Sequence, residues 1–229
     1  MGISGISYAP AVQVRSGAER ATLVRRTYGL VFLSILATMA GTAFTLVQPG
    51  LFNAVAAHPF ITMIAAFIPL IMAQRSAREF PKNLVLTFLF TFVMGVAIAP
   101  GMYLAERAVP GVVLQAGALT FAAFGALSLY AVFSRRDFSA WGAFFFVGLI
   151  VLLVASLLNF FFQSVAVGLF LSAIGVFVFS GLLVFDTWRL LRSGQLGQDD
   201  YVLATVSIYL DLLNMFMFIL RLLSGGNRR

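Results

Sequence analysis

The chain has 229 residues, of which 61% are hydrophobic and only 10% are charged, whereas a soluble domain has about 25% charged residues. Such a composition cannot cover a water-facing surface, so we predict an all-α integral membrane protein with one membrane domain. The formal net charge of +7 does not indicate nucleic-acid binding, because the basic residues are spread over short segments between apolar runs. The lack of cysteine and the single histidine, His58, exclude disulfides and cysteine or multi-histidine metal sites.

The first 26 residues are polar and carry Arg15, Arg20, Arg25 and Arg26. No apolar stretch with a small-residue cleavage site precedes Thr27, so we expect no cleavable signal peptide. We therefore divide the chain into a polar cytoplasmic segment, a membrane domain and a short tail, at 1–26, 27–223 and 224–229.

Seven apolar runs are long enough, or nearly long enough, to cross a bilayer as helices. The second run is the shortest and contains Pro69, and the fifth and sixth are joined by so few residues, around Gln163 and Ser164, that they form either a hairpin or one broken helix. The seven predicted spans are 27–47, 60–74, 83–104, 112–133, 141–162, 166–188 and 201–223.

Basic residues alternate between the two sides of this arrangement. Eleven of the fifteen fall in the N-terminal segment and in the loops 75–82, 134–140 and 189–200. Because cytoplasmic loops carry the excess of Lys and Arg, we predict a multi-pass protein of the cell (inner) membrane with a cytoplasmic N-terminus and an external C-terminus.

Two acids lie within the apolar runs: Asp186 in FVFSGLLVFDTWRLL and Asp211 in VLATVSIYLDLLNMFMF. A carboxylate at the centre of a span costs about 2.5–3.5 kcal/mol on insertion scales and is a functional-site candidate by default. The two residues are nearly equidistant from the loop 194–200. In an antiparallel helix pair they should lie within about two turns of each other in depth.

Two carboxyl groups that meet in a low-dielectric site tend to share a proton. Loss of that proton near neutral pH creates repulsion, which favours either separation or cation binding, and calcium suits carboxylate oxygens. We therefore predict a pH sensor and ion pathway at Asp186 and Asp211, which are also the candidate calcium ligands. Arg189 could pair with Asp186, and Arg75, Arg78 and Lys82 are rival partners at the same level.

A supporting polar face is predicted on the last span, where Ser207, Asp211, Asn214 and Arg221 recur at helical spacing. Two simpler interpretations stay open for the acids: Asp186 as an interfacial acid paired with Arg189, and Asp211 as a buried, protonated structural residue.

A second polar face lies on the fifth span and serves either helix packing or an outer vestibule; it consists of Ser156, Asn159 and Gln163. Enzyme motifs are weak or missing elsewhere in the chain. The GxSG string at 2–5, which intramembrane serine proteases carry, lies outside any span. A retinal protein is excluded because the only lysine, Lys82, is in a loop. The YD and GxGD strings of aspartyl intramembrane proteases are absent. We therefore predict that the protein is not an enzyme.

Several segments resemble the transmembrane Bax inhibitor motif family, in particular its bacterial branch. They are LVRRTYGLVFLSILATMAG, LSLYAVFSRRDFSAWG, FSGLLVFDTWRLL and YVLATVSIYLDLLNMFMFILRLL. The resemblance implies seven helices with the last one central and wrapped by six others. It also implies that Asp186 and Asp211 are the family's pH sensor, that Arg75 latches to Asp186, and that the function is a pH-sensitive calcium leak with no cofactor besides the transported ion. In another bacterial branch the role is to bind a membrane-anchored ATP-dependent protease. Such a regulatory role, through the segment 1–26, is the alternative function.

Overall fold

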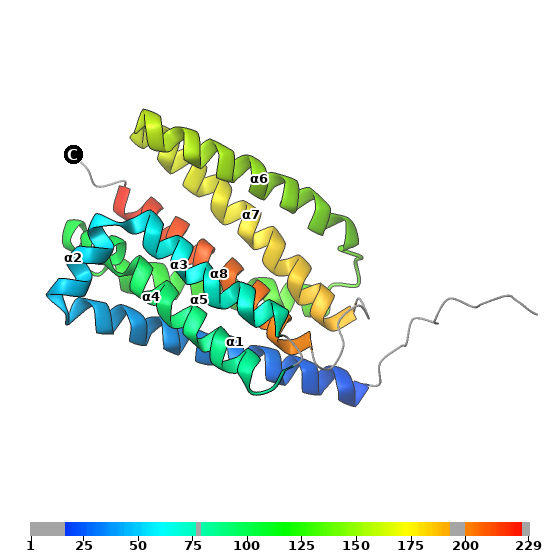
Figure 1. Ribbon diagram of the computed structural model, residues 1–229. Helices are drawn as coiled ribbons and strands as arrows, with labels where there is room; N and C mark the ends of the chain where they lie inside the picture. The colour runs from blue at the N-terminus through cyan, green and yellow to red at the C-terminus, as the bar shows by residue number, and fades with distance from the viewer. Residues whose placement is uncertain (1–16, 77–78, 193–199, 226–229) are drawn as a thin grey trace, which may run out of the picture.

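A computed structural model describes residues 17–76, 79–192 and 200–225, and in these residues every regular element is a helix. The helices run up and down and lie side by side along one common direction, apart from the short α2 (Figure 1). Their bounds are α1 Gly17–Leu46, α2 Pro49–Ala57, α3 Pro59–Arg75, α4 Lys82–Ala108, α5 Val112–Phe133, α6 Ser139–Phe162, α7 Val165–Arg192 and α8 Tyr201–Gly225.

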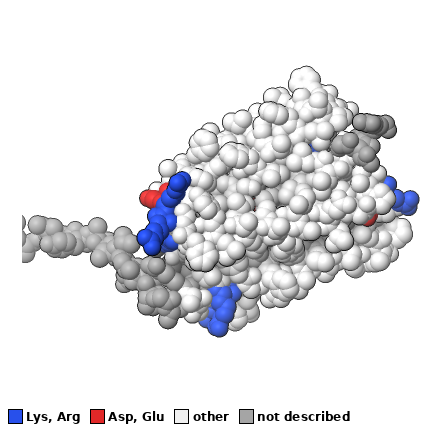
Figure 2. Space-filling model, turned by 180° about the vertical axis from the view of Figure 1, so that it is seen from behind, with Lys and Arg blue, Asp and Glu red and all other residues white. Residues whose placement is uncertain are grey.

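Six of these helices are long and apolar enough to cross a membrane, and the bent pair α2 and α3 makes up to seven. We call the end of the bundle where α1 begins the N-terminal end, and the end where α8 finishes the C-terminal end. Figure 2 shows that the charged side chains visible on one face lie toward these two ends, with a broad uncharged band between them. This band is the surface that a membrane protein presents to lipid, and the predicted fold class is confirmed.

Two helix boundaries differ from the prediction. The segment 48–59, expected to be a loop, forms α2, which begins at Pro49 because proline is well suited to the first helical position. A break at His58 then turns the chain by 100° into α3. The second difference is the start of α1, which begins at Gly17, well before the apolar run that starts at Thr27. The length of an apolar run reflects the thickness of the membrane core, and a helix can extend beyond that core into polar sequence.

The C-terminal helix α8 is the centre of the bundle. Its buried side chains join both of the larger core clusters, and α7, α1, α5 and α4 pack against it. Ala66 and Leu70 of α3 reach the same core beside Tyr209 of α8. The sixth helix, α6, packs mainly along α7 and presents many phenylalanines on its exposed face.

The fifth and sixth predicted spans form a hairpin, not one broken helix. Gln163 ends α6 in the left-handed conformation, with φ 50°, and α7 starts two residues later and runs back along α6. At the N-terminal end, Phe138 is buried against Trp141 with a ring-centroid distance of 4.8 Å. Arg192 donates to the carbonyl of Val132 at 2.8 Å, which ties the end of α7 to α5.

Helices α1 and α4 approach each other at backbone distance. Gly41 and Gly95 face the partner helix, and a Cβ on Gly95 would collide with the carbonyl oxygen of Thr38. Small residues permit such an approach in membrane proteins. The hydroxyl of Thr38 also donates to the carbonyl of Thr91 at 2.9 Å, and that of Thr42 donates to the carbonyl of Gly95 at 3.0 Å. This contact holds α1 and α4 together, and both of these helices pack against α8.

Tyr209→Phe should lower the free energy of unfolding by about 0.6–1.5 kcal/mol, the range for one buried hydrogen bond. The Tyr209 hydroxyl lies 2.7 Å from the hydroxyl of Thr38, and the ring packs edge-on against Phe90. The variant keeps the ring and loses only the bond between α1 and α8. Unfolding in mixed detergent measures the change. Tyr130→Phe, at an exposed tyrosine with no side-chain hydrogen bond in the described residues, is the control and should unfold like the wild type.

Candidate functional site

The antiparallel pair α7 and α8 brings the two predicted acids together at the N-terminal end of the bundle. A side-chain hydrogen-bond contact joins the carboxyl groups of Asp186 and Asp211. Asp211 is buried, with 5% of its surface exposed, and Asp186 is half-buried. The juxtaposition expected from the nearly equal distances to the connecting loop is therefore present.

A hydrogen bond between two carboxyl groups requires a proton on one of them, because two carboxylates offer acceptors only. No donor in the described part of the chain reaches Oδ2 of Asp211, although this atom is buried. The positive charge that acts on Asp186 comes from Arg189, one turn further along α7. A shared proton or a bound cation is what satisfies such a pair, since an unsatisfied buried carboxylate is very costly.

The latch predicted at Arg75 is not in contact with this pair in the described structure. Arg75 lies in the last turn of α3, its side chain is exposed, and it makes no hydrogen bond or ion pair among the described residues. Its rival Arg78 lies outside the described residues. Arg189, the remaining alternative, is the arginine whose charge acts on Asp186. The direction of a long side chain at a helix end depends on tertiary packing that helix position alone does not specify.

The predicted supporting face of α8 is half-buried near Asp211 and exposed at its far end. Ser207 and Asn214 are half-buried, and the Asn214 amide donates to the carbonyl of Leu210 at 2.8 Å in its own helix. Arg221 is exposed at the C-terminal end, far from the acid pair along α8. Within the described part of the chain, these residues make one face polar but form no hydrogen-bonded chain to Asp211.

A stripe of hydroxyl residues on α1 was not predicted. All of its members are buried, and the hydroxyls of Thr27 and Ser34 have no hydrogen-bond partner in the described residues. Thr205 of α8 donates to the carbonyl of Thr27 at 3.3 Å, which places this stripe against the helix of Asp211. A spacing of three, four and seven residues in an apolar helix is the signal that could have revealed it. The members are Thr27, Ser34, Thr38, Thr42 and Thr45.

The acid pair offers a cation the oxygen atoms of two carboxyl groups. Within the described residues there is no group of three or more His, Cys, Asp or Glu side chains that could hold a metal ion. Calcium takes six to eight oxygen ligands at a dedicated site. Two carboxyl groups supply only part of such a shell.

The bundle and the buried acid pair define a polytopic helical membrane protein with an ionisable centre near one end of its core. The family model described as "Inhibitor of apoptosis-promoting Bax1" matches residues 20–229, so the chain belongs to the Bax inhibitor family.

Curated relatives come from viruses, animals and bacteria. The chain is 35% identical to the Golgi anti-apoptotic protein of Vaccinia virus (strain Lister) and 32% identical to protein lifeguard 4 of Mus musculus, in each case over 97% of this chain and 93% of the relative. It is 36% identical to a membrane protein of Vibrio cholerae over 91% of this chain and 92% of the relative. The likeness therefore extends over nearly the whole membrane domain and not over one motif.

Proposed function

We propose that this chain is a pH-sensitive cation leak of the membrane, that calcium is its cargo, and that Asp186 and Asp211 are its sensor. The single observation that carries the proposal is the contact between these two carboxyl groups in the core. In this function the two acids bind protons and cations and catalyse no reaction, so the proposed protein is a channel and not an enzyme. Family membership supports a membrane protein of the Bax inhibitor type, because the match covers residues 20–229 and so includes both acids.

In the proposed mechanism the shared proton holds α7 and α8 together. Two carboxylates about 4 Å apart repel by about 4 kcal/mol at an effective dielectric constant of about 20. Loss of the proton therefore favours either a wider separation of the helices or entry of a cation between the acids. In this mechanism the hydroxyls of Thr27 and Ser34 on α1, which have no hydrogen-bond partner among the described residues, are the candidates to supply further oxygen atoms from the neighbouring helix. The leak should accordingly increase as the pH rises.

The proposed orientation places the N-terminal end of the bundle in the cytoplasm of a cell whose inner or plasma membrane holds the protein. Most of the described Lys and Arg residues lie at that end, and cytoplasmic loops carry the excess of positive charge. They are Arg25, Arg26, Arg75, Lys82, Arg135, Arg136, Arg189 and Arg192, against Arg107 and Arg221 at the C-terminal end. The sensor then faces the cytoplasmic half of the membrane.

Calcium flux through the wild-type protein in proteoliposomes tests this function. We expect flux above that of empty liposomes, rising from acidic to alkaline pH as the acid pair loses its proton. A calcium dye trapped inside the vesicles records the rate at each pH. Flux equal to that of empty liposomes at every pH would contradict the proposal.

The alternative is a regulatory protein that binds a membrane-anchored ATP-dependent protease through its N-terminal segment. Residues 1–16 of that segment lie outside the described residues, so no described contact bears on it. Deleting residues 1–20 and testing for a co-purifying protease separates the two functions. Loss of an associated protease with unchanged flux would support the regulatory role.

A further inference from the structure

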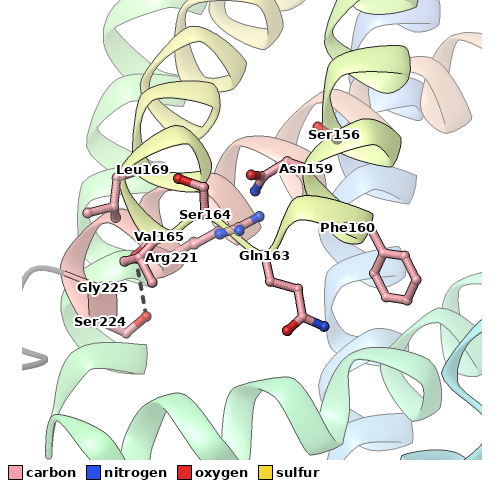
Figure 3. Close-up of a pocket in the computed structure, with 10 residues that line it drawn as sticks. All are labelled: Ser156, Asn159, Phe160, Gln163, Ser164, Val165, Leu169, Arg221, Ser224 and Gly225. Carbon is pink, nitrogen blue, oxygen red and sulfur yellow. Dashed lines mark hydrogen bonds between the residues drawn. The ribbon is translucent and has the colours of Figure 1, made fainter.

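A second polar site lies at the C-terminal end of the bundle, where α6 ends, α7 begins and α8 finishes. These three helix ends enclose a cavity of about 390 Å³ (Figure 3). Arg221 is ten residues beyond Asp211 on α8, a rise of about 15 Å along the helix. The cavity is therefore separate from the acid pair and has no part in the proposed pH sensor. Its polar lining comes from Ser156, Asn159, Gln163, Ser164, Arg221 and Ser224.

The guanidinium group of Arg221 points into this cavity. Figure 3 shows it directed from α8 toward Asn159 and Ser164. It can lie there because position 168 is glycine: a Cβ on Gly168 would collide with the Arg221 guanidinium and would lie 3.2 Å from the Asn159 amide nitrogen. The close approach of three helices thus leaves room for one cationic group and the amide beside it.

No acid in the described part of the chain pairs with Arg221. Glu106 is the acid at this end of the bundle, and it accepts hydrogen bonds from the backbone N–H groups of Gly111 at 2.6 Å and Val113 at 3.1 Å. Its carboxylate is therefore engaged at the start of α5. An arginine at the membrane surface with no acidic partner is suited to bind an anion from outside the chain.

The side chain of Asn159 gives a second, independent observation at this cavity. Its side chain is 7% exposed, and its Oδ1 atom is buried without a hydrogen-bond partner in the described residues. A buried, unpaired carbonyl oxygen is costly unless a donor reaches it. The N-terminus of α7 adds to the positive potential, because Ser164 and Val165 at its first turn line the cavity.

We propose that this cavity binds a phosphate oxyanion that carries a neighbouring hydrogen-bond donor, as the headgroup of a glycerophospholipid does. The Arg221 guanidinium fork matches two phosphate oxygens. The hydroxyl or ammonium group of the headgroup donates to Oδ1 of Asn159 and satisfies that atom. The cavity lies where the apolar band of the bundle ends, which is the level of lipid phosphates in a bilayer.

Binding measurements on the full-length protein in detergent test this site. Short-chain phosphatidylethanolamine, short-chain phosphatidylglycerol and inorganic phosphate are titrated separately, with binding followed by native mass spectrometry and by thermal unfolding. Arg221→Ala should weaken phospholipid binding about tenfold or more, as expected for the loss of one charge-assisted contact. Arg221→Lys keeps the charge without the fork and should bind with intermediate affinity.

Arg107→Ala is the matched control. Arg107 lies at the same end of the bundle but outside the cavity, and it donates to the Tyr103 hydroxyl at 2.7 and 3.0 Å. This variant should bind phospholipid like the wild type. Tighter binding of phospholipid than of phosphate identifies a headgroup as the ligand, and equal binding identifies the free oxyanion. Binding by Arg221→Ala that equals the wild type for all three ligands, or an equal loss in Arg107→Ala, would overturn the site. Since the readout is binding and not flux, the result is independent of the proposed leak.

Discussion

Asp211→Asn should remove most of the pH dependence of calcium flux, reducing the ratio of alkaline to acidic flux about tenfold or more. The amide cannot ionise, so it cannot generate the repulsion that we assign to the opening of α7 from α8. A like-charge repulsion of a few kcal/mol exceeds the 1.4 kcal/mol that corresponds to tenfold in an equilibrium. Calcium flux against pH in proteoliposomes measures the ratio.

The partner variant and an exposed aspartate make this test specific. Asp186→Asn should act in the same direction, and the double variant should add little, because the two carboxyl groups act as one unit. Asp137→Asn is the matched control: Asp137 is exposed and accepts from the backbone N–H of Ser139, a role that asparagine also fills. Its pH profile should equal that of the wild type. Unchanged flux and unchanged pH response in both Asp186→Asn and Asp211→Asn would rule the sensor out.

Gly95→Ala should lower the free energy of unfolding by about 1–3 kcal/mol, the usual cost of forcing extra atoms into a close-packed contact. The new methyl group would collide with the backbone carbonyl of Thr38 on α1, and backbone cannot move aside as a flexible side chain can. The helices must separate, which also lengthens the Thr42 hydrogen bond to the carbonyl of Gly95. Unfolding in mixed detergent measures the loss.

Gly101→Ala provides the comparison within the same helix. No atom lies within 4 Å of a Cβ built at Gly101, so alanine fits there without displacement. Alanine is a better helix former than glycine by up to about 1 kcal/mol, so stability should stay equal or rise slightly. Equal unfolding of Gly95→Ala and Gly101→Ala would show that α1 and α4 are not held at backbone distance.

The helical bundle was predictable because bilayer thickness imposes one length scale on every apolar run. The runs 112–133 and 201–223 correspond closely to α5 and α8. The ends of α1 and the short helix α2 were not predictable in this way, because both lie in polar or interrupted sequence. Their bounds depend on proline position and on packing against α4, which hydropathy does not record.

The acid pair was predictable for a geometric reason. Nearly equal spacing from a short loop brings Asp186 and Asp211 to similar levels in an antiparallel helix pair. The partner of Asp186 was left open, because arginines at several helix ends lie at the same depth and only tertiary packing decides between them. The arrangement of Arg221 beside Asn159 depends on the empty space at Gly168, which no periodicity in the sequence indicates.

The sharp bend between α2 and α3 has a consequence for the surrounding lipid. The 17 residues of α3 rise only about 25 Å, whereas the hydrocarbon core of a bilayer is about 30 Å thick. The 100° bend prevents α2 from extending this span. A short span thins the bilayer beside it, and α3 packs through Leu70 into the same core as Tyr209 of α8. We therefore expect bilayer thickness to affect the packing of the helix that carries Asp211, and thin membranes should suit this protein best.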